Sequence, residues 1–197
     1  MPFNYSQELI DKAINYSAYR QVINDTLAQP SQDETAEKMR PYIKKNVVLM
    51  EKYDESYQIS NALKTALEAA PATIWLVLTE GWCGDAAFNV PMLAAIEKAV
   101  PEKVQLRFLF RDSNLELMDA NLTDGCRSIP KLIVLSKDLK DLATWGPRPD
   151  DLQLLMKGWK NEGLALQALL PKVQHWYDAD QTKSIQKELT AIVKSYA

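Results

Sequence analysis

The sequence contains few of the residues that build metal sites and disulfide frameworks. Its 197 residues include one histidine and two cysteines. A structural zinc site usually takes four cysteine or histidine ligands, and a disulfide framework needs several cysteine pairs. No nucleotide, flavin or metal motif stands out, so we expect no cofactor. In a reducing cytoplasm each cysteine is expected to be catalytic, redox-active or simply buried.

The chain also lacks an excess of positive charge and a long apolar run. Its formal net charge of -3 at pH 7 provides no broad positive field for holding nucleic acid or anionic lipid. No apolar run approaches the roughly 20 residues that cross a bilayer, and residues 1–10 do not have the pattern of a leader. We therefore expect a cytoplasmic protein without nucleic-acid or membrane partners, whose oligomeric state the sequence leaves open.

The first seventy residues are polar and helix-forming. Apolar residues recur at helical spacing and predict helices near 6–28, 33–52 and 56–70. The loop between the first two helices contains Ser31 and Asp33, and either side chain can accept hydrogen bonds from free amides at the next helix start. With 47% hydrophobic residues, the chain is expected to form one compact unit with embellishments.

After Pro71 the pattern changes to strands alternating with helices. Residues 74–78 form a short, unbroken apolar run, as expected for a strand buried on both faces of a sheet. The elements predicted beyond it are a helix at 84–99, a strand at 104–110, a helix at 113–121, strands at 131–136 and 140–145, and a helix at 150–170. This order can bury a four-stranded mixed sheet between helices.

The C-terminal residues form an amphipathic helical pattern. One helical face carries four apolar side chains, Ile185, Leu189, Ile192 and Tyr196. Because such a face must be covered, we expect the C-terminus to pack against the rest of the protein.

Cys83 lies where the buried strand turns into a helix. The first amides of a helix have no partner within it, and together with the helix dipole they favour an anion. Helix-start positions lower a cysteine pKa from about 8.5 to roughly 3.5–7.5, so Cys83 is expected to be a nucleophile. The alternative is a buried, inert cysteine. The flanking residues favour the reactive interpretation because they suggest an exposed turn: Gly81, Trp82, Gly84 and Asp85.

The motifs around this cysteine resemble the thioredoxin family. The sequence WCGD at 82–85 follows an apolar strand, Pro91 lies eight residues beyond Cys83, and Ile129 and Pro130 precede the next predicted strand. The resemblance implies an α/β thioredoxin-like fold, with a four-stranded mixed sheet flanked by helices. It also implies that Pro130 is a cis-proline facing Cys83, although cis X-Pro bonds are uncommon.

Further segments resemble a subgroup with WCGDA in place of the CxxC motif and an added N-terminal helical region. They are WCGDA at 82–86, RD at 111–112, RSIPK at 127–131 and WGPRP at 145–149. The resemblance divides the chain into an N-terminal helical extension (1–71), a thioredoxin-like domain (72–170) and a C-terminal helical extension (171–197).

The chain departs from ordinary thioredoxin at two positions. Ala86 stands where thioredoxin has its second cysteine, so a local dithiol cannot form. Val77 stands where thioredoxin has a buried aspartate that assists proton transfer. Cys126, four residues before Pro130, is the in-chain candidate for a resolving thiol, and the alternative is a loop cysteine without a role.

Charges near the cysteine act in both directions. Glu80 and Asp85 would oppose thiolate formation, whereas arginines at 111, 127 and 148 could offset them if folded close. The predicted catalytic residues are Cys83 and Cys126. The predicted substrate-binding residues are Trp82, Gly84, Asp85, Ile129, Pro130 and Arg148.

Two functions fit these features. The first is a monothiol oxidoreductase in which Cys83 attacks a protein disulfide or the adduct of a low-molecular-weight thiol, and Cys126 or a small thiol releases it. The second is a non-catalytic interaction module that kept the fold and lost the resolving cysteine. A thiol peroxidase is disfavoured because the threonine and proline expected just before a peroxidatic cysteine are missing.

Overall fold

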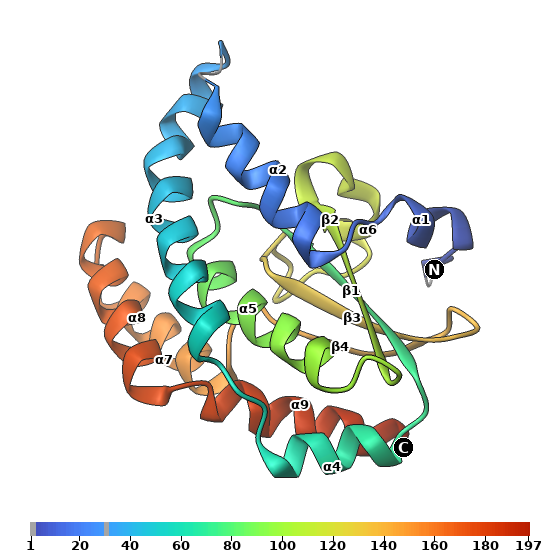
Figure 1. The fold of residues 1–197 in the computed structure, drawn as a ribbon. Coiled ribbons are helices and arrows are strands. Elements are labelled where there is room, and N and C mark those ends of the chain that lie inside the picture. The colour runs from blue at the N-terminus through green and yellow to red at the C-terminus, as the bar shows by residue number, and fades with distance from the viewer. Residues whose placement is uncertain (1–2, 30–31) are drawn as a thin grey trace.

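A four-stranded sheet lies at the centre of the protein, in the order β2–β1–β3–β4 (Figure 1). The computed structural model describes residues 3–29 and 32–197. The strands are β1 (Thr73–Thr79), β2 (Val104–Phe110), β3 (Lys131–Ser136) and β4 (Asp141–Trp145). β1 pairs in parallel with β2 and antiparallel with β3, and β3 pairs antiparallel with β4. The predicted mixed sheet is therefore confirmed.

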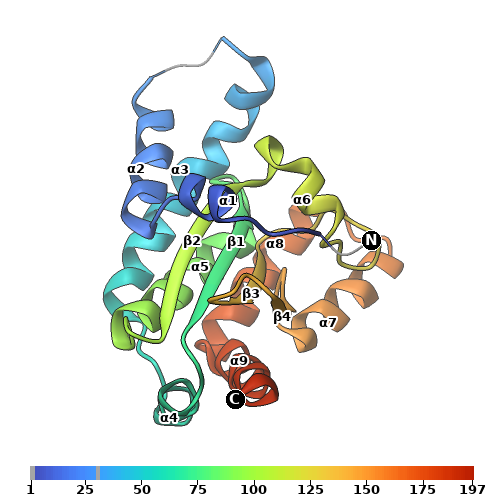
Figure 2. The same ribbon diagram turned by 90° about the vertical axis from the view of Figure 1, so that its right-hand side faces the viewer.

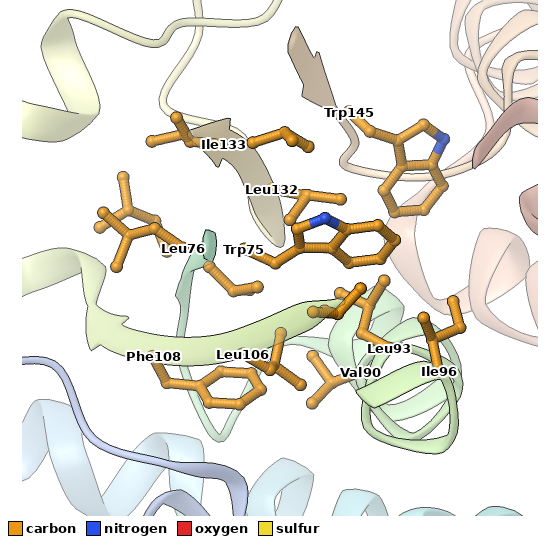
Figure 3. Close-up of a cluster of buried hydrophobic side chains, with 14 of the residues drawn as sticks. Trp75, Leu76, Val90, Leu93, Ile96, Leu106, Phe108, Leu132, Ile133 and Trp145 are labelled. Atoms are coloured by element: carbon orange, nitrogen blue, oxygen red, sulfur yellow. The ribbon is translucent and has the colours of Figure 1, made fainter. Parts of the chain in front are cut away.

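The central strand β1 is buried along its whole length. Its Trp75 is fully buried, opposite Leu106 of β2 and Val134 of β3. Figure 3 shows the Trp75 indole among aliphatic side chains from neighbouring strands and from the helix that follows β1. The apolar run at 74–78 needs cover on both faces, which explains its central position.

The single helix predicted over 6–28 is wrong. Two helices cover this region, α1 (Gln7–Lys12) and α2 (Tyr16–Ala28). Between them Ile14 forms a bridge with Phe108 of β2, with N–O distances of 3.0 and 2.8 Å in the two directions. Asn15 then caps α2 by accepting the Ala18 amide at 2.9 Å. Pairing with the edge of the sheet therefore interrupts the helix.

The next two helices exist as predicted but differ in length. They are α3 (Glu34–Ser56) and α4 (Asn61–Ala69). Asp33 caps α3 by accepting the Thr35 amide at 2.8 Å, and Ser31 lies outside the described residues. Because α3 continues to Ser56, α4 starts later than predicted, after its cap Ser60.

α5 (Gly84–Ala99) follows β1 and packs along α3 (Figure 1). After β2 the chain forms a short 3-10 helix, η1 (Arg111–Ser113), and then α6 (Leu115–Asp119). The helix expected over 113–121 is therefore shorter than predicted. These elements place the start of α5 beside the loop that leads into β3.

The C-terminal part contains three helices, α7 (Asp150–Asn161), α8 (Leu166–Asp180) and α9 (Lys183–Tyr196). The helix predicted over 150–170 is wrong in extent, because the chain turns at Gly163, where φ is +78°. α8 then continues through Pro171, which the sequence suggested as a boundary. α9 packs on α4, and Figure 2 shows both at the same end of the molecule, so the predicted docking of the C-terminus is confirmed.

A second hydrophobic cluster joins α3, α7 and α8 to α5. It consists of Tyr53, Phe88, Leu152, Met156, Leu169 and Tyr177. The rings of Phe88 and Tyr177 stack with centroids 4.0 Å apart, and Tyr53 lies 5.6 Å from Phe88. This cluster holds α3 and α8 beside the first turns of α5.

Candidate functional site

Cys83 is the N-cap residue of α5, and its sulfur is buried at the junction with β1. The Cys83 amide donates to the carbonyl of Glu80 at 3.1 Å, which closes the turn after β1. Only 6% of the residue is exposed, and its Sγ donates to the carbonyl oxygen of Ile129 at 3.2 Å. A hydrogen bond from the thiol to a carbonyl favours the protonated form.

Burial raises the pKa of the Cys83 thiol to about 12, because ionisation would place a charge where little water reaches it. The negative charge of Asp85 also raises this pKa. The amides of Asp85 and Ala86 and the guanidinium of Arg148 lower it, but they do not outweigh burial. The expected lowering of the pKa is therefore wrong in direction. The helix amides are present as predicted, but the burial of the thiol has the larger effect.

Asp85 is held by a buried network next to Cys83. Arg148 donates to one of its carboxylate oxygens from Nη2 at 2.5 Å and from Nε at 3.1 Å. The hydroxyl of Tyr177 donates to the other oxygen at 2.9 Å, and Asn89 donates to that hydroxyl at 2.9 Å. Burial raises the pKa of Tyr177 well above its usual value, so the hydroxyl remains a donor. The network thus ties α8 to the first turn of α5.

The three arginines considered from the sequence have different partners. Arg148 pairs with Asp85, the acid beside the cysteine. Arg127 pairs with Asp119 at 2.6 Å, and Arg111 pairs with Asp112 at 2.7 Å. Arg111 also lies over the ring of Trp82, 4.9 Å from its centroid. Arg148 is therefore the arginine that offsets the charge of Asp85.

Two proline-containing loops meet beside the thiol. The Ile129–Pro130 and Gly146–Pro147 peptide bonds are both cis. Gly146 has a φ of +107°, and a Cβ at this position would lie 2.2 Å from the carbonyl oxygen of Pro130. Only glycine fits here, because any side chain would collide with the backbone that precedes β3.

A cavity of about 620 Å³ opens beside Cys83. The cysteine, the turn around it and the loop before β3 form one part of its lining, and α3 and α8 supply most of the rest. The apolar residues contributed by these two helices are Met39, Pro41, Tyr42, Leu49, Leu166, Leu169, Leu170 and Val173. The charged residues of the lining are Lys45, Asp85, Arg111, Arg127 and Arg148.

Most of the predicted site residues meet in this cavity. Its lining includes Trp82, Cys83, Gly84, Asp85, Ile129 and Arg148. Pro130 is buried and does not line the cavity. Cys126 is free, exposed and also outside the lining, in a turn closed by two hydrogen bonds of 3.0 Å with Thr123. The structure thus groups the residues around Cys83 and leaves Cys126 apart.

Sequence reasoning missed several residues of the site. Tyr177 and Asn89, which complete the network around Asp85, were not singled out as functional residues. Asn89 carried a local signal, because it is a polar residue within the strongly apolar first half of the helix predicted at 84–99. The walls from α3 and α8 carried none, since their proximity to Cys83 depends on how distant helices pack.

Within residues 3–29 and 32–197, no group of three or more histidine, cysteine, aspartate or glutamate side chains could hold a metal ion. None of the helices described there is both long and apolar enough to pass through a membrane.

Comparison with known protein families agrees with the observed fold. The thioredoxin family model matches residues 30–161, which include the whole sheet, Cys83 and α3. The chain belongs to the thioredoxin family. The match supports the family and fold, and the WCGDA subgroup suggested by the sequence stays a prediction.

Solved structures similar to this thioredoxin family member share its fold. One is a protein of unknown function from Pseudomonas aeruginosa, with a TM-score of 0.61 and 18% identity over 99% of this chain and 100% of the other. Another is an HIV epitope-scaffold, with a TM-score of 0.61 and 17% identity over 98% of this chain and 100% of the other. A search of curated proteins finds no match.

The high pKa of Cys83 in this thioredoxin family member predicts an unusual alkylation profile. In a Cys126→Ala background, the rate of alkylation by iodoacetamide should rise about tenfold per pH unit from pH 7 to pH 9, because the thiolate fraction rises tenfold per unit below the pKa. Intact-mass spectrometry at each pH measures this rate. A plateau below pH 8.5 would contradict the prediction. The exposed Cys126, followed in Cys83→Ser, serves as the accessible reference.

Proposed function

We propose that this protein is a monothiol oxidoreductase that carries out thiol–disulfide exchange through Cys83. The observation that carries the proposal is the position of Cys83, in the lining of a ligand-sized cavity at the start of α5. The amides of Asp85 and Ala86 and the guanidinium of Arg148 favour the thiolate, and so would stabilise the charge that develops on sulfur during exchange. Membership of the thioredoxin family supports the same chemistry.

The proposed reaction has two balanced steps. Cys83 loses its proton and attacks one sulfur of a disulfide RSSR. The S–S bond breaks, a mixed disulfide forms between Cys83 and one R group, and the leaving thiolate takes up a proton as RSH. A second thiol, R′SH, then gives up its proton and attacks the sulfur of that R group. RSSR′ departs, and Cys83 recovers its proton as a free thiol.

We propose that the second thiol comes from solution. Cys126 is exposed and outside the cavity, and Ala86 occupies the position where the family has its resolving cysteine. A low-molecular-weight thiol can enter a cavity of about 620 Å³. The proposal places the protein in the cytoplasm, where such thiols are abundant and kept reduced.

A specific observation favours a second candidate, a thioredoxin-fold binding module without catalysis. Burial raises the pKa of Cys83 to about 12, and its thiol is satisfied by the carbonyl of Ile129. A thiol in this state is a poor nucleophile at neutral pH. In this candidate the cavity binds a ligand, and Cys83 serves as an apolar part of its wall.

Mass spectrometry after incubation with oxidised glutathione separates the two candidates. We expect the wild-type protein and Cys126→Ala to gain a mixed disulfide at Cys83, and added reduced thiol to release it. Cys83→Ser should lose this adduct completely, because no other thiol lines the cavity. Absence of an adduct at Cys83 over hours at pH 8, with normal labelling of Cys126, would reject exchange and support the binding module.

A further inference from the structure

We propose that the cavity selects low-molecular-weight disulfides that have an aliphatic body and an anionic end. This inference rests on the proposed exchange activity and names the class of substrate for the same site. Three features of the cavity carry it: its apolar walls, the charges around it and the depth of the sulfur.

The walls favour an aliphatic body. α3 contributes Met39 and Leu49, and α8 contributes Leu169, Leu170 and Val173, so apolar side chains face the cavity from two helices. Its volume of about 620 Å³ falls within the range of small-molecule sites, roughly 300–1,000 Å³. An aliphatic chain that enters this space removes apolar surface of both partners from water, which favours binding.

The charges favour an anionic end. The lining contains four cationic side chains and one acid, and Arg148 already neutralises that acid. Asp119 and Asp112, outside the lining, pair with Arg127 and Arg111. For Lys45, no ion pair within 4.0 Å occurs in the described parts of the chain. The three arginines are therefore paired, and the positive charge of Lys45 is left to complement a carboxylate.

The depth of the sulfur favours a small substrate over a folded protein. Only 6% of Cys83 is exposed, and the residue lines a cavity to which α3 and α8 both contribute side chains. A disulfide in the surface of a folded protein would have to enter this cavity to reach the sulfur. A flexible chain of a few carbons is small enough for a cavity of about 620 Å³.

Matched disulfides test the preference in a Cys126→Ala background. The probes are 6,6′-dithiodihexanoic acid, its uncharged diamide and cystamine, and the readout is the rate of mixed-disulfide formation at Cys83 by intact mass. Each rate is divided by the rate of the same probe with the urea-unfolded protein, which removes differences in intrinsic reactivity. We expect the carboxylate probe to react about tenfold faster than the diamide. Cystamine, which is cationic, should react more slowly than the diamide.

Variants of the walls link the preference to the cavity. Lys45→Glu should reduce the ratio of the carboxylate rate to the diamide rate roughly fivefold, whereas Lys44→Glu, at an exposed position outside the lining, should leave it unchanged. Leu170→Asn should slow both six-carbon probes, and Leu154→Asn, at an exposed position outside the lining, should not.

Octanoate tests the cavity without any exchange step. If the inference holds, millimolar octanoate slows the alkylation of Cys83 by iodoacetamide, and Lys45→Glu weakens this protection. Adducts that form at Cys83 equally fast with all three probes, together with no protection by octanoate, would overturn the inference and leave the exchange activity standing. Protection by octanoate without any disulfide adduct would reject the exchange activity, and with it the disulfide substrate.

Discussion

Asp85→Asn should lower the pKa of Cys83 and speed its alkylation at pH 8 by about tenfold or more. Asp85 disfavours the thiolate, and its replacement also frees the charge of Arg148 to favour the thiolate, so both changes act in the same direction. The rate of alkylation by iodoacetamide from pH 6 to pH 10, in a Cys126→Ala background, measures the effect. An unchanged or slower rate would contradict this electrostatic account.

A matched control separates local charge from net charge. Asp138→Asn removes the same charge in the turn between β3 and β4, where the side chain is exposed. This variant should leave the alkylation of Cys83 unchanged. Because Asp85→Asn removes one member of a buried ion pair, its melting temperature should fall, and the rates are compared at a temperature where both proteins are folded.

Arg148→Gln should have the opposite effect on the thiol. This change removes the positive charge that offsets Asp85, so the pKa of Cys83 rises and alkylation at pH 8 slows. Opposite shifts in the two variants would identify charge as the cause, because a merely loosened site would speed alkylation in both.

Gly146→Ala should destabilise the protein by about 3–5 kcal/mol. The new methyl group would lie 2.2 Å from the carbonyl oxygen of Pro130, which is backbone and cannot rotate away. The residue would also keep a φ of +107°, which alanine rarely adopts. Urea unfolding followed by circular dichroism measures the loss of unfolding free energy. A change below about 1 kcal/mol would show that the two loops have more freedom than this packing implies.

Gly158→Ala is a control that should change the free energy of unfolding in the opposite direction. Gly158 lies inside α7, and no atom would lie within 4 Å of an added Cβ. Alanine should therefore stabilise the helix by about 0.5–1 kcal/mol relative to glycine. The pair of variants compares the same chemical change where space is absent and where it is present.

The elements of the sheet could be predicted because their signals are local. The apolar run at 74–78 needs burial on both faces, and it forms the centre of the sheet, with Trp75 fully buried. The junction that carries Cys83 was placed correctly because the change from strand to helix is visible in consecutive residues. The cis Ile129–Pro130 bond was implied only by the resemblance to thioredoxin.

The errors arose where distant segments decide the local structure. The predicted helix over 6–28 did not include the bridge between Ile14 and Phe108, which joins residues 94 positions apart. The helix predicted over 150–170 followed an apolar pattern that continues through the turn at Gly163. In both cases the helical spacing of apolar residues continues in the sequence past the point where the helix ends in the structure.

The sequence by itself determined the four strands, the helix between β1 and β2, the central place of β1 and the position of Cys83 at the start of α5. These properties follow from residue periodicity and from neighbours along the chain. Only the tertiary structure decided that the pKa of Cys83 is raised, that Arg148 is the arginine that meets Asp85, and that α3 and α8 line a cavity beside the sulfur. Desolvation and ion pairing depend on which distant groups surround an atom in space, and such groups leave no local pattern in the sequence.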